Sequence, residues 1–332
     1  MSRSSERIRL MRITKSEAAE ILLAMDNILI LAHENPDGDA VGSTCALCKG
    51  LRSIGKNAAV SLEKFSKNDE KLAEGLIATA DFNYDHIIAV DTADNRIMGV
   101  GETSLNKNCE VELCIDHHIS NIFYAKNTCL DEKAAAAGEV VYDILKEMNI
   151  EITKDIAECI YVAVATDTGC FRYSNTTAKT FRTAADMADL GADVAAINKI
   201  QFETKSKEYA AIEKMAISSM QLHFDGKCAI LAITNEMYVE SNVSDSETQP
   251  LASLPRQIEG VYAGITVKEK KKGMCRISVR TNAPVNASKI ASYLGGGGHS
   301  MAAGCSFEGS VEDAVKTVLA YTEKELKESG LI

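Results

Sequence analysis

The feature that most constrains the fold is a series of short apolar segments in the first third of the chain. They cover 28–32, 57–62, 86–90 and 111–115 and read ILILA, NAAVSL, HIIAV and VELCI. A run that is apolar throughout is typical of a strand covered on both faces. The stretch 38–55, between the first two, has helical spacing and ends on Gly55. Strands that alternate with helices predict an α/β domain with a mainly parallel sheet and helices on both faces.

The rest of the chain contains more helix and then a second, smaller unit. Thr14 and Glu17 form a capping-box pattern that predicts a helix through about residue 25. From Thr153 apolar residues recur every four positions, and the polar helical stretch at 206–221 is typical of a connector. Strand patterns cover 227–234 and 260–281, the second as a hairpin, and a helix pattern covers 311–328. We expect a first domain at 1–205, a helical linker at 206–222 and an α+β domain at 223–332.

Composition predicts a cytoplasmic protein and argues against two kinds of partner. The net charge of −11 disfavours binding to duplex nucleic acid, which relies on a broad basic surface. No apolar run approaches the roughly 20 residues that cross a bilayer, and the N-terminal residues lack the pattern of a signal peptide. The ten cysteines are scattered through apparent helices and strands, which indicates reduced thiols in a cytosolic protein.

Acidic and histidine side chains follow three of the predicted strands and one helix. In chain order they are His33, Asp37 and Asp39, then Asp91, then Asp116, His117 and His118, and finally Asp167. The carboxyl ends of parallel strands meet at one edge of a sheet, so we expect these side chains to gather there. Each has an alternative role when taken alone: Asp91 could cap a helix, His33 could be a hydrogen-bonding residue, and Asp167 could be a surface acid.

Carboxylates this close together repel one another and would take up protons unless cations lie among them. Mixed imidazole and carboxylate ligands suit Mn²⁺, Fe²⁺, Co²⁺ or Zn²⁺, and the absence of cysteine from the cluster argues against a structural zinc site. There are more carboxylates than one ion needs, which predicts two ions with one carboxylate between them. Two ions roughly 3.5–4 Å apart are the usual arrangement for phosphoryl transfer to water.

Four of these segments resemble, in order, the metal-site motifs of the DHH phosphoesterase superfamily. They read HENPDGDAVGS at 33–43, VDTAD at 90–94, CIDHHISN at 114–121 and ATDTGCFRYSNTT at 165–177. The segment GGGGHSMAAG at 295–304 is similar to the signature of the DHH-associated (DHHA) domain. Within the superfamily the chain most resembles the stand-alone oligoribonuclease (nanoRNase)/pAp phosphatase group, whose members degrade RNA of a few nucleotides and remove a phosphate from 3′-phosphoadenosine 5′-phosphate (pAp).

The resemblance implies roles for the clustered residues. It implies His33, Asp37 and Asp91 on one Mn²⁺, and Asp39, Asp91, His117 and Asp167 on the other, with Asp91 bridging the two. Asp116 would orient a ligand, as carboxylates commonly do around metal sites, and His118 would face the substrate phosphate. Asp91, Asp116 and His118 are therefore the expected catalytic residues beside the metal ligands.

The second domain is expected to bind the rest of the substrate across a cleft. Gly295–Gly298 let backbone N–H groups approach a phosphate, and His299 adds a donor. Of the run, Gly296, Gly297 and Gly298 are the expected contacts. In the strand pattern CRISVRT, Arg280 takes the position of an arginine that contacts phosphate in the family. Arg172 is a further candidate. A flexible loop and a solvated arginine are the alternatives for the glycine run and for Arg172.

The sequence departs from the family pattern at two places and contains two further motifs outside the expected site. Residues 134–137 read AAAA where family members often carry Ser or Thr, so a hydroxyl contact is expected to be missing. Thr281 occupies a position that is often Ser. Cys45 and Cys48 form a Cys-x-x-Cys that we interpret as two packed thiols. The basic run KEKKKG at 268–273 fits a solvated hairpin tip better than an RNA-binding segment.

The expected function is hydrolysis of short oligoribonucleotides to mononucleotides and of pAp to AMP, with two divalent ions, for which the resemblance favours Mn²⁺. The substrate would be short single-stranded RNA or a nucleotide bisphosphate, with no duplex DNA and no membrane partner. The alternatives are a phosphodiesterase for cyclic or linear dinucleotides such as pApA, and a nucleotide sensor without catalytic activity. The oligomeric state stays open between a monomer and a homodimer.

Overall fold

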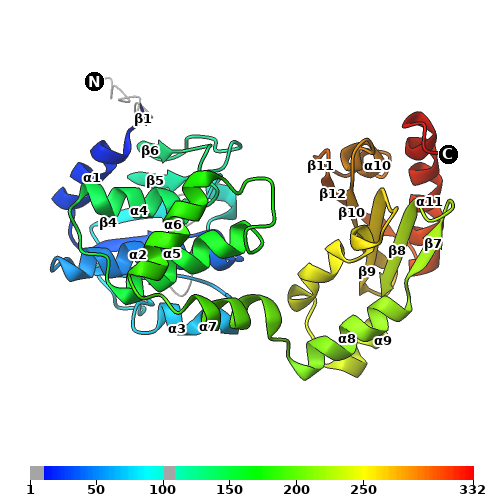
Figure 1. Cartoon of the computed structure of the whole chain (residues 1–332), viewed down its shortest axis with the longest axis horizontal. Helices are drawn as coiled ribbons and strands as arrows, with labels where there is room; N and C mark the ends of the chain where they lie inside the picture. The colour runs from blue at the N-terminus through cyan, green and yellow to red at the C-terminus, as the bar shows by residue number, and fades with distance from the viewer. Residues whose placement is uncertain (1–10, 101–108) are drawn as a thin grey trace, which may run out of the picture. The chain divides into compact units, whose positions relative to one another are not determined.

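The computed structural model describes residues 11–100 and 109–332, which form two compact units (Figure 1). The first unit ends at Thr204 and the second begins at Lys205. Helix α8 (Lys207–Ser218), which covers most of the expected linker, belongs to the second unit. The N-terminal residues for which we predicted no signal peptide lie partly outside the described residues. No helix within 11–100 and 109–332 is both long enough and apolar enough to cross a membrane.

The first unit contains a six-stranded sheet in which every neighbouring pair is parallel. Its order is β1-β6-β5-β4-β2-β3. The strands are β1 (Met11–Arg12), β2 (Ile28–Leu31), β3 (Ala58–Ser61), β4 (His86–Val90), β5 (Leu113–Asp116) and β6 (Asn127–Leu130). The four apolar segments form β2 to β5, as predicted, and all residues of β2, β3 and β5 are buried.

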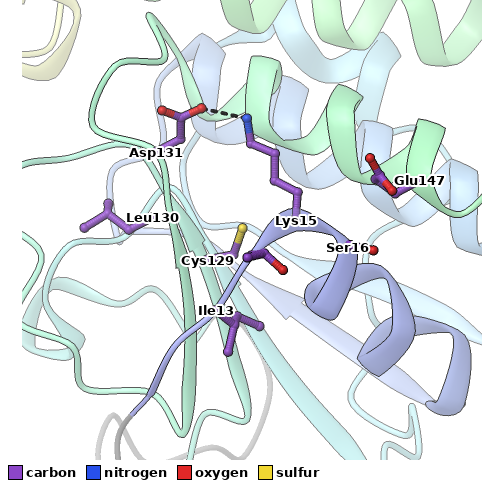
Figure 2. Close-up of a pocket in the computed structure, with 8 residues that line it drawn as sticks. Ile13, Lys15, Ser16, Cys129, Leu130, Asp131 and Glu147 are labelled. Carbon is purple, nitrogen blue, oxygen red and sulfur yellow. Dashed lines mark hydrogen bonds and ion pairs between the residues drawn. The ribbon is translucent and has the colours of Figure 1, made fainter.

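Three predicted helices of the first unit form, at 15–24, 38–53 and 154–167, and the described residues contain further helices that were not predicted. The helices of this unit are α1 (Lys15–Ala24), α2 (Gly38–Ser53), α3 (Glu70–Ala73), α4 (Ala137–Glu147), α5 (Lys154–Asp167), α6 (Ala178–Asp189) and α7 (Val194–Asn198). Thr14 and Glu17 form the predicted capping box at the start of α1. Lys15, which follows Thr14, forms ion pairs with Asp131 (2.6 Å) and Asp143 (2.7 Å). It lines a surface pocket of about 470 Å³ whose eight lining residues include none of the candidate site residues (Figure 2).

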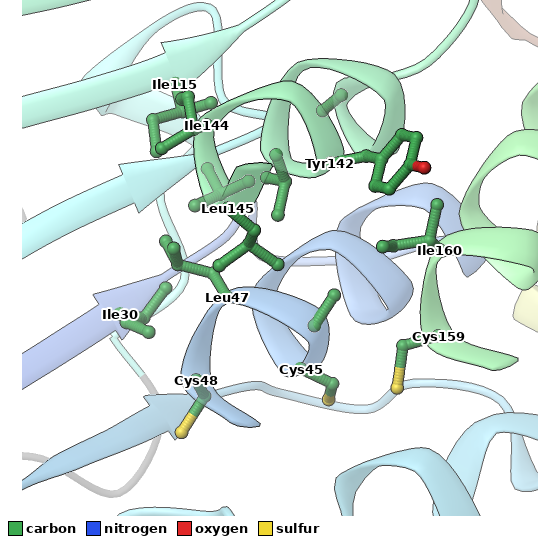
Figure 3. Close-up of a cluster of buried hydrophobic side chains, with 14 of the residues drawn as sticks. Ile30, Cys45, Leu47, Cys48, Ile115, Tyr142, Ile144, Leu145, Cys159 and Ile160 are labelled. Atoms are coloured by element: carbon green, nitrogen blue, oxygen red, sulfur yellow. The ribbon is translucent and has the colours of Figure 1, made fainter. Parts of the chain in front are cut away.

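Helices α2 and α4 lie against one face of the sheet, and α1 and α5 pack against these two helices in the same core. Figure 3 shows Ile30 of β2 beside Leu47 of α2, and Ile115 of β5 beside Ile144 of α4. Cys45 and Cys48 are fully buried, free thiols in this core, in agreement with the packed-thiol interpretation.

The opposite face of the sheet is covered, among the described residues, by connecting segments instead of the predicted helices. Ala78, Phe82, Met98 and Tyr124 pack there against the apolar side chains of β2 and β4. Because crossovers between parallel strands are right-handed, Ala78, in the connection from β3 to β4, and Met98, in the connection from β4 to β5, lie on this second face. Prediction of helices on both faces was therefore correct for one face only within the described part of the chain.

The second unit contains a mixed six-stranded sheet of order β11-β12-β10-β9-β8-β7. Its strands are β7 (Gln221–His223), β8 (Cys228–Ile233), β9 (Ala263–Lys271), β10 (Met274–Thr281), β11 (Gly297–His299) and β12 (Ala302–Glu308), and its helices after α8 are α9 (Asn235–Ser241), α10 (Ala287–Ser292) and α11 (Val311–Glu328). The predicted hairpin forms from β9 and β10 and turns through Gly273, whose φ is +78°. Ile265 and Ile277 belong to the core that contains α10 and α11.

Candidate metal centre

The candidate ligands come together at the carboxyl ends of β2, β4 and β5, as the sheet predicts. His33 and Asp37 follow β2, and Asp37 is the N-cap of α2, where its carboxylate accepts from the N–H groups of Asp39 and Ala40. Asp91 directly follows β4. The others are Asp39 in the first turn of α2, Asp116 at the end of β5, His117 and His118 next to it, and Asp167 as the last residue of α5.

One group of candidate ligands surrounds the imidazole of His117. Its Nε2 lies 3.5 Å from Asp91 Oδ1, 3.6 Å from Asp39 Oδ2 and 3.8 Å from Asp167 Oδ2. The three carboxylates come from a loop and two helices that are far apart in the sequence. The ligand atoms of Asp39, His117 and Asp167 lie close enough to one another to hold one metal ion.

A second group forms around His33. Its Nε2 lies 3.8 Å from Asp91 Oδ2 and 4.0 Å from Asp37 Oδ1, and these three residues could also hold one ion. The two carboxylate oxygens of Asp91 therefore face different groups, Oδ1 toward His117 and Oδ2 toward His33. This is the arrangement that a carboxylate shared by two cations requires.

Asp91 also carries two local features that fit a metal ion. The residue is 3% exposed, yet its Oδ1 accepts no hydrogen bond from any described residue. A buried carboxylate oxygen without a partner is costly unless a cation satisfies it. Its backbone is left-handed, with φ of +54°, a conformation that costs a residue with a side chain of order 1 kcal/mol and is typical of functional positions. The donor set and this unpaired oxygen fit divalent cations.

The pKa values of the residues around His117 show that this group attracts positive charge strongly. Burial and repulsion by Asp91 raise the pKa of Asp39 well above its usual range. Burial likewise raises the pKa of Asp167 to about 6. Burial alone would lower the pKa of His117, but Asp91, Asp39 and Asp167 together raise it to about 10. The carboxylates therefore hold a proton among them, and a divalent cation would compete for the same place.

Asp116 is fully buried and fixes the loop that carries the two histidines. Its Oδ1 accepts from the N–H groups of His117 and His118 and from His118 Nδ1 at 2.8 Å, and its Oδ2 accepts from Asn121 Nδ2 at 2.6 Å. Burial favours the neutral acid, but these donors hold the pKa of Asp116 below its usual value. Asp116 thus orients the ring of His118, the expected substrate-facing residue, and only the backbone of His117.

Two asparagines contribute to the centre without having been singled out from the sequence. Asn121 fixes Asp116, and Asn175 Nδ2 donates to the backbone oxygens of Ala135 (3.1 Å) and Asp167 (3.2 Å). Both lie inside the quoted motifs CIDHHISN and ATDTGCFRYSNTT. The order of residues along the chain gives no indication that their amides point back at the carboxylates.

Arg280 of the second unit lies on β10, paired with Gly264 of β9 and Ala302 of β12. Burial and the neighbouring guanidinium groups of Arg256 and Arg276 lower its pKa, so positive charge accumulates on this side of the sheet. Among the described residues no carboxylate forms an ion pair with Arg280, whose Nη1 donates to the backbone oxygen of Val279.

The glycine run forms an edge strand instead of a flexible loop. Gly297, Gly298 and His299 form β11 and pair with β12. A Cβ on Gly296 would lie 2.3 Å from the backbone oxygen of Gly304, and one on Gly298, where φ is +144°, would lie 2.6 Å from the oxygen of Ala302. These two glycines are required by the close approach of the backbones. All of β11, including His299, is exposed.

Arg172 is exposed and lies in the turn after α5. Its Nε donates to the backbone oxygen of Gly169 at 2.5 Å. That turn is left-handed at Gly169, Cys170 and Phe171. That contact lies two residues after Asp167, and Arg172 forms no ion pair with another described residue.

Sequence comparison assigns both units. The DHH family N-terminal domain matches residues 27–164, and the DHHA1 domain matches residues 225–328. A relative from Thermus thermophilus, named bifunctional oligoribonuclease and PAP phosphatase NrnA, is 30% identical over 95% of each chain. A second, from Streptococcus mutans and named probable bifunctional oligoribonuclease and PAP phosphatase NrnA, is 27% identical over 85% of this chain and 90% of its own.

Other relatives carry a different activity in their names. The cyclic-di-AMP phosphodiesterase GdpP of Geobacillus thermodenitrificans is 24% identical over 87% of this chain, which spans only 46% of that protein. Among solved structures, an exopolyphosphatase-related protein from Bacteroides fragilis has a TM-score of 0.81 at 23% identity, covering 93% of this chain and 95% of its own. The exonuclease RecJ bound to manganese has a TM-score of 0.52 at 16% identity, covering 94% and 95%. At these identities the two structures establish the fold.

Proposed function

The chain belongs to the DHH family, and from this premise we propose that it is a phosphoesterase that hydrolyses short oligoribonucleotides to mononucleotides and pAp to AMP. The observation that carries the proposal is Asp91, whose two carboxylate oxygens face two separate groups of ligands. The relatives named oligoribonuclease and PAP phosphatase, which this chain covers almost end to end, support these substrates.

We propose two divalent ions for the centre, with Mn²⁺ as the ion in use. His33, Asp37 and Asp91 would hold one, and Asp39, Asp91, His117 and Asp167 the other. When bound, such ions lower the pKa of water and neutralise charge on the phosphoryl oxygens. The carboxylates and imidazoles supplied by the chain are ligands that Mn²⁺ accepts, and manganese in RecJ supports the choice.

The remaining residues of the centre would position and protonate the substrate. His118 Nδ1 is engaged by Asp116, so its Nε2 is the ring atom that remains to meet a phosphate oxygen. The hydrogen bond that His118 Nδ1 donates to Asp116 raises the pKa of His118, which favours a ring that carries a proton for donation. In the second unit we propose Arg280, Gly296, Gly297, Gly298 and His299 as contacts for anionic parts of the substrate, and Arg172 as a further contact in the first.

The test measures Mn²⁺-dependent release of phosphate from pAp and of mononucleotides from pApA and from a short RNA of about five nucleotides. Asp91→Asn serves as the blank, because it removes the shared ligand. Asp94→Asn is the matched control: Asp94 lies in the same loop but pairs with Arg96. Activity on the short RNA and on pAp that is lost in Asp91→Asn and kept in Asp94→Asn supports the proposal.

Other outcomes of the same assay select the alternatives. Activity confined to pApA would assign the protein to dinucleotide hydrolysis, the activity in the name of GdpP. No activity on any substrate would favour the nucleotide sensor. Comparable rates on RNAs of about 5 and about 50 nucleotides would refute the restriction to short substrates. The net charge of −11 supports exclusion of duplex DNA, and a cytoplasmic location stays a prediction.

A further inference from the structure

Asp39 is a candidate ligand whose carboxylate is almost saturated with hydrogen bonds. The residue is 1% exposed. Its Oδ1 accepts from Ser43 Oγ at 2.7 Å and from the N–H of Gly138 at 3.0 Å, and its Oδ2 accepts from the N–H of Ala137 at 2.7 Å. A carboxylate has about four acceptor positions, so three of them are occupied by the protein itself. One position, on Oδ2, remains.

The remaining position belongs to the oxygen that faces the centre. Asp39 Oδ2 lies 3.6 Å from His117 Nε2, in the group that also contains Asp167. Oδ1, by contrast, has both of its positions taken by Ser43 and Gly138. A cation in this group can therefore be bound by Asp39 through one oxygen only, and the side chain cannot turn to offer both.

Helix α4 explains why the carboxylate stays in this orientation. Its N-cap is Ala136, which has no side-chain acceptor, and the first N–H groups of the helix are buried. Asp39 of α2 supplies the missing acceptor from another part of the chain. The positive end of the helix dipole in turn favours the charged form of Asp39. The alanines at 134–137 offer no hydroxyl, and the carboxylate of Asp39 does the capping.

Among the residues that the structure describes, Ser43 is the one side chain that donates to Asp39. It lies one turn later on the same helix, is fully buried, and forms no other hydrogen bond with a described residue. Its neighbour Thr44 is equally buried but donates only to the backbone oxygens of Ala40 and Val41. The two adjacent hydroxyls thus have different tasks, one directed at the centre and one at the helix.

We propose that Ser43 is a positioning residue that, with the first two N–H groups of α4, holds Asp39 so that it binds a metal ion through Oδ2 alone. The inference rests on the proposed metal centre. Partners of metal ligands commonly contribute 10–100-fold to metal affinity. Removal of the Ser43 hydroxyl is therefore expected to weaken one of two ions and leave the other, held by His33 and Asp37, unchanged.

The experiment is a titration of the full, metal-free chain with Mn²⁺ alone, in which free Mn²⁺ is followed by electron paramagnetic resonance. Ser43→Ala is expected to weaken one binding step by about 10–100-fold. Thr44→Val, the matched control, is expected to leave both steps unchanged. Ser43→Cys keeps the volume and a weak donor and is expected to lie between wild type and Ser43→Ala. It also provides the comparison if Ser43→Ala does not fold, which far-UV circular dichroism reveals.

Three results would overturn the inference. They are an unchanged titration for the folded Ser43 variants, an equal loss of both steps, and the same loss in Thr44→Val. Because the titration contains no substrate, it is independent of the hydrolysis assay. If wild type binds two ions and hydrolyses nothing, only the proposed function fails. If wild type has no second binding step, the two-ion centre and the role of Ser43 fail together.

Discussion

The contact between α2 and α5 provides a sharp prediction about the stability of the first unit. Both helices carry candidate ligands, Asp39 on α2 and Asp167 on α5. They pack so closely that a Cβ on Gly42 of α2 would lie 2.4 Å from the backbone oxygen of Cys159 and 2.9 Å from the backbone nitrogen of Ala163. We predict that Gly42→Ala forces the two helices apart.

The size of the effect follows from these distances. Ordinary contacts with carbon begin at about 3.5 Å, so one of the two backbones must move by about 1 Å. Overpacking of a well-packed core costs about 1–3 kcal/mol, and a clash between backbones belongs at the upper end because neither can rotate away. Alanine in a helix gains about 1 kcal/mol over glycine. We therefore expect a net loss of about 2 kcal/mol in the free energy of unfolding.

Gly50→Ala is the matched control in the same helix. The substitution and the gain in helix propensity are the same, but the Cβ would lie 2.5 Å from Leu145 Cδ2, the end of a flexible side chain that can move aside. We expect the free energy of unfolding to stay within about 1 kcal/mol of wild type. The pair separates the cost of the helix contact from the general effect of replacing a helical glycine.

The assay is urea unfolding of the metal-free chain followed by far-UV circular dichroism, since the chain has no tryptophan. Mn²⁺ titration of both variants then tests the link to the centre. Displacement of α2 from α5 separates Asp39 from Asp167, so Gly42→Ala is expected to bind Mn²⁺ more weakly and Gly50→Ala to bind as wild type does. Equal unfolding free energies for the two variants would refute the reasoning.

Three further predictions concern pH and the second unit. Burial, with Gln201 opposing it, raises the pKa of Asp69 to about 6. The stabilisation from its bound proton is complete below the unfolded pKa of 3.8 and is lost as pH rises through about 6. The free energy of unfolding of Asp69→Asn, measured in urea, should therefore rise relative to wild type by up to about 3 kcal/mol by pH 8. A difference between the two proteins that does not vary with pH would contradict this. His117, with a pKa of about 10, and Asp167, with a pKa of about 6, must both lose a proton to bind a cation, so Mn²⁺ affinity should fall as pH decreases and should fall more steeply below pH 6; a titration that is flat between pH 5 and 7 would exclude these roles. In β11, Gly298→Ala should destabilise the second unit by about 1–3 kcal/mol, because its Cβ meets the Ala302 oxygen, whereas Gly297→Ala, with nothing within 4 Å, should not; equal thermal unfolding temperatures would contradict this.

The parts of the fold that could be predicted from the sequence are those whose burial is periodic or continuous. The four apolar strands and the capping box of Thr14 are of this kind. Strands β1 and β6 were missed because a two-residue strand has no period and Asn127–Leu130 begins with two polar residues. Helices were expected on the second face of the sheet, but the described residues that pack there belong to connecting segments, and the direction of a crossover does not show as a residue pattern.

The same distinction, between what shows as a residue pattern and what does not, applies to the candidate metal centre. That the acids gather at one edge follows from parallel strands, since each strand delivers its next residues to the same place. What each acid contacts does not follow, because the partners are distant in the chain. Asp39 is held by Ala137 and Gly138, about a hundred residues later. In the sequence the alanines at 134–137 indicated a missing contact, and only the fold reveals the carboxylate that replaces it.

The same contacts explain why the centre can hold so many acids without disrupting the fold. Asp39 is buried and repelled by Asp91, which by itself would favour opening of α2. It is also the acceptor for the buried N–H groups of α4, so releasing it would leave that helix uncapped. Asp116 likewise is held by two backbone N–H groups and Asn121. Each of these carboxylates is thus fixed by structure that would itself be lost if the carboxylate moved.

Asp91 is the exception: it has a left-handed backbone and an unpaired Oδ1, and it faces both groups. Its side chain is therefore the point at which the protein depends on a cation, and the place where replacement by a neutral amide should weaken both ions together.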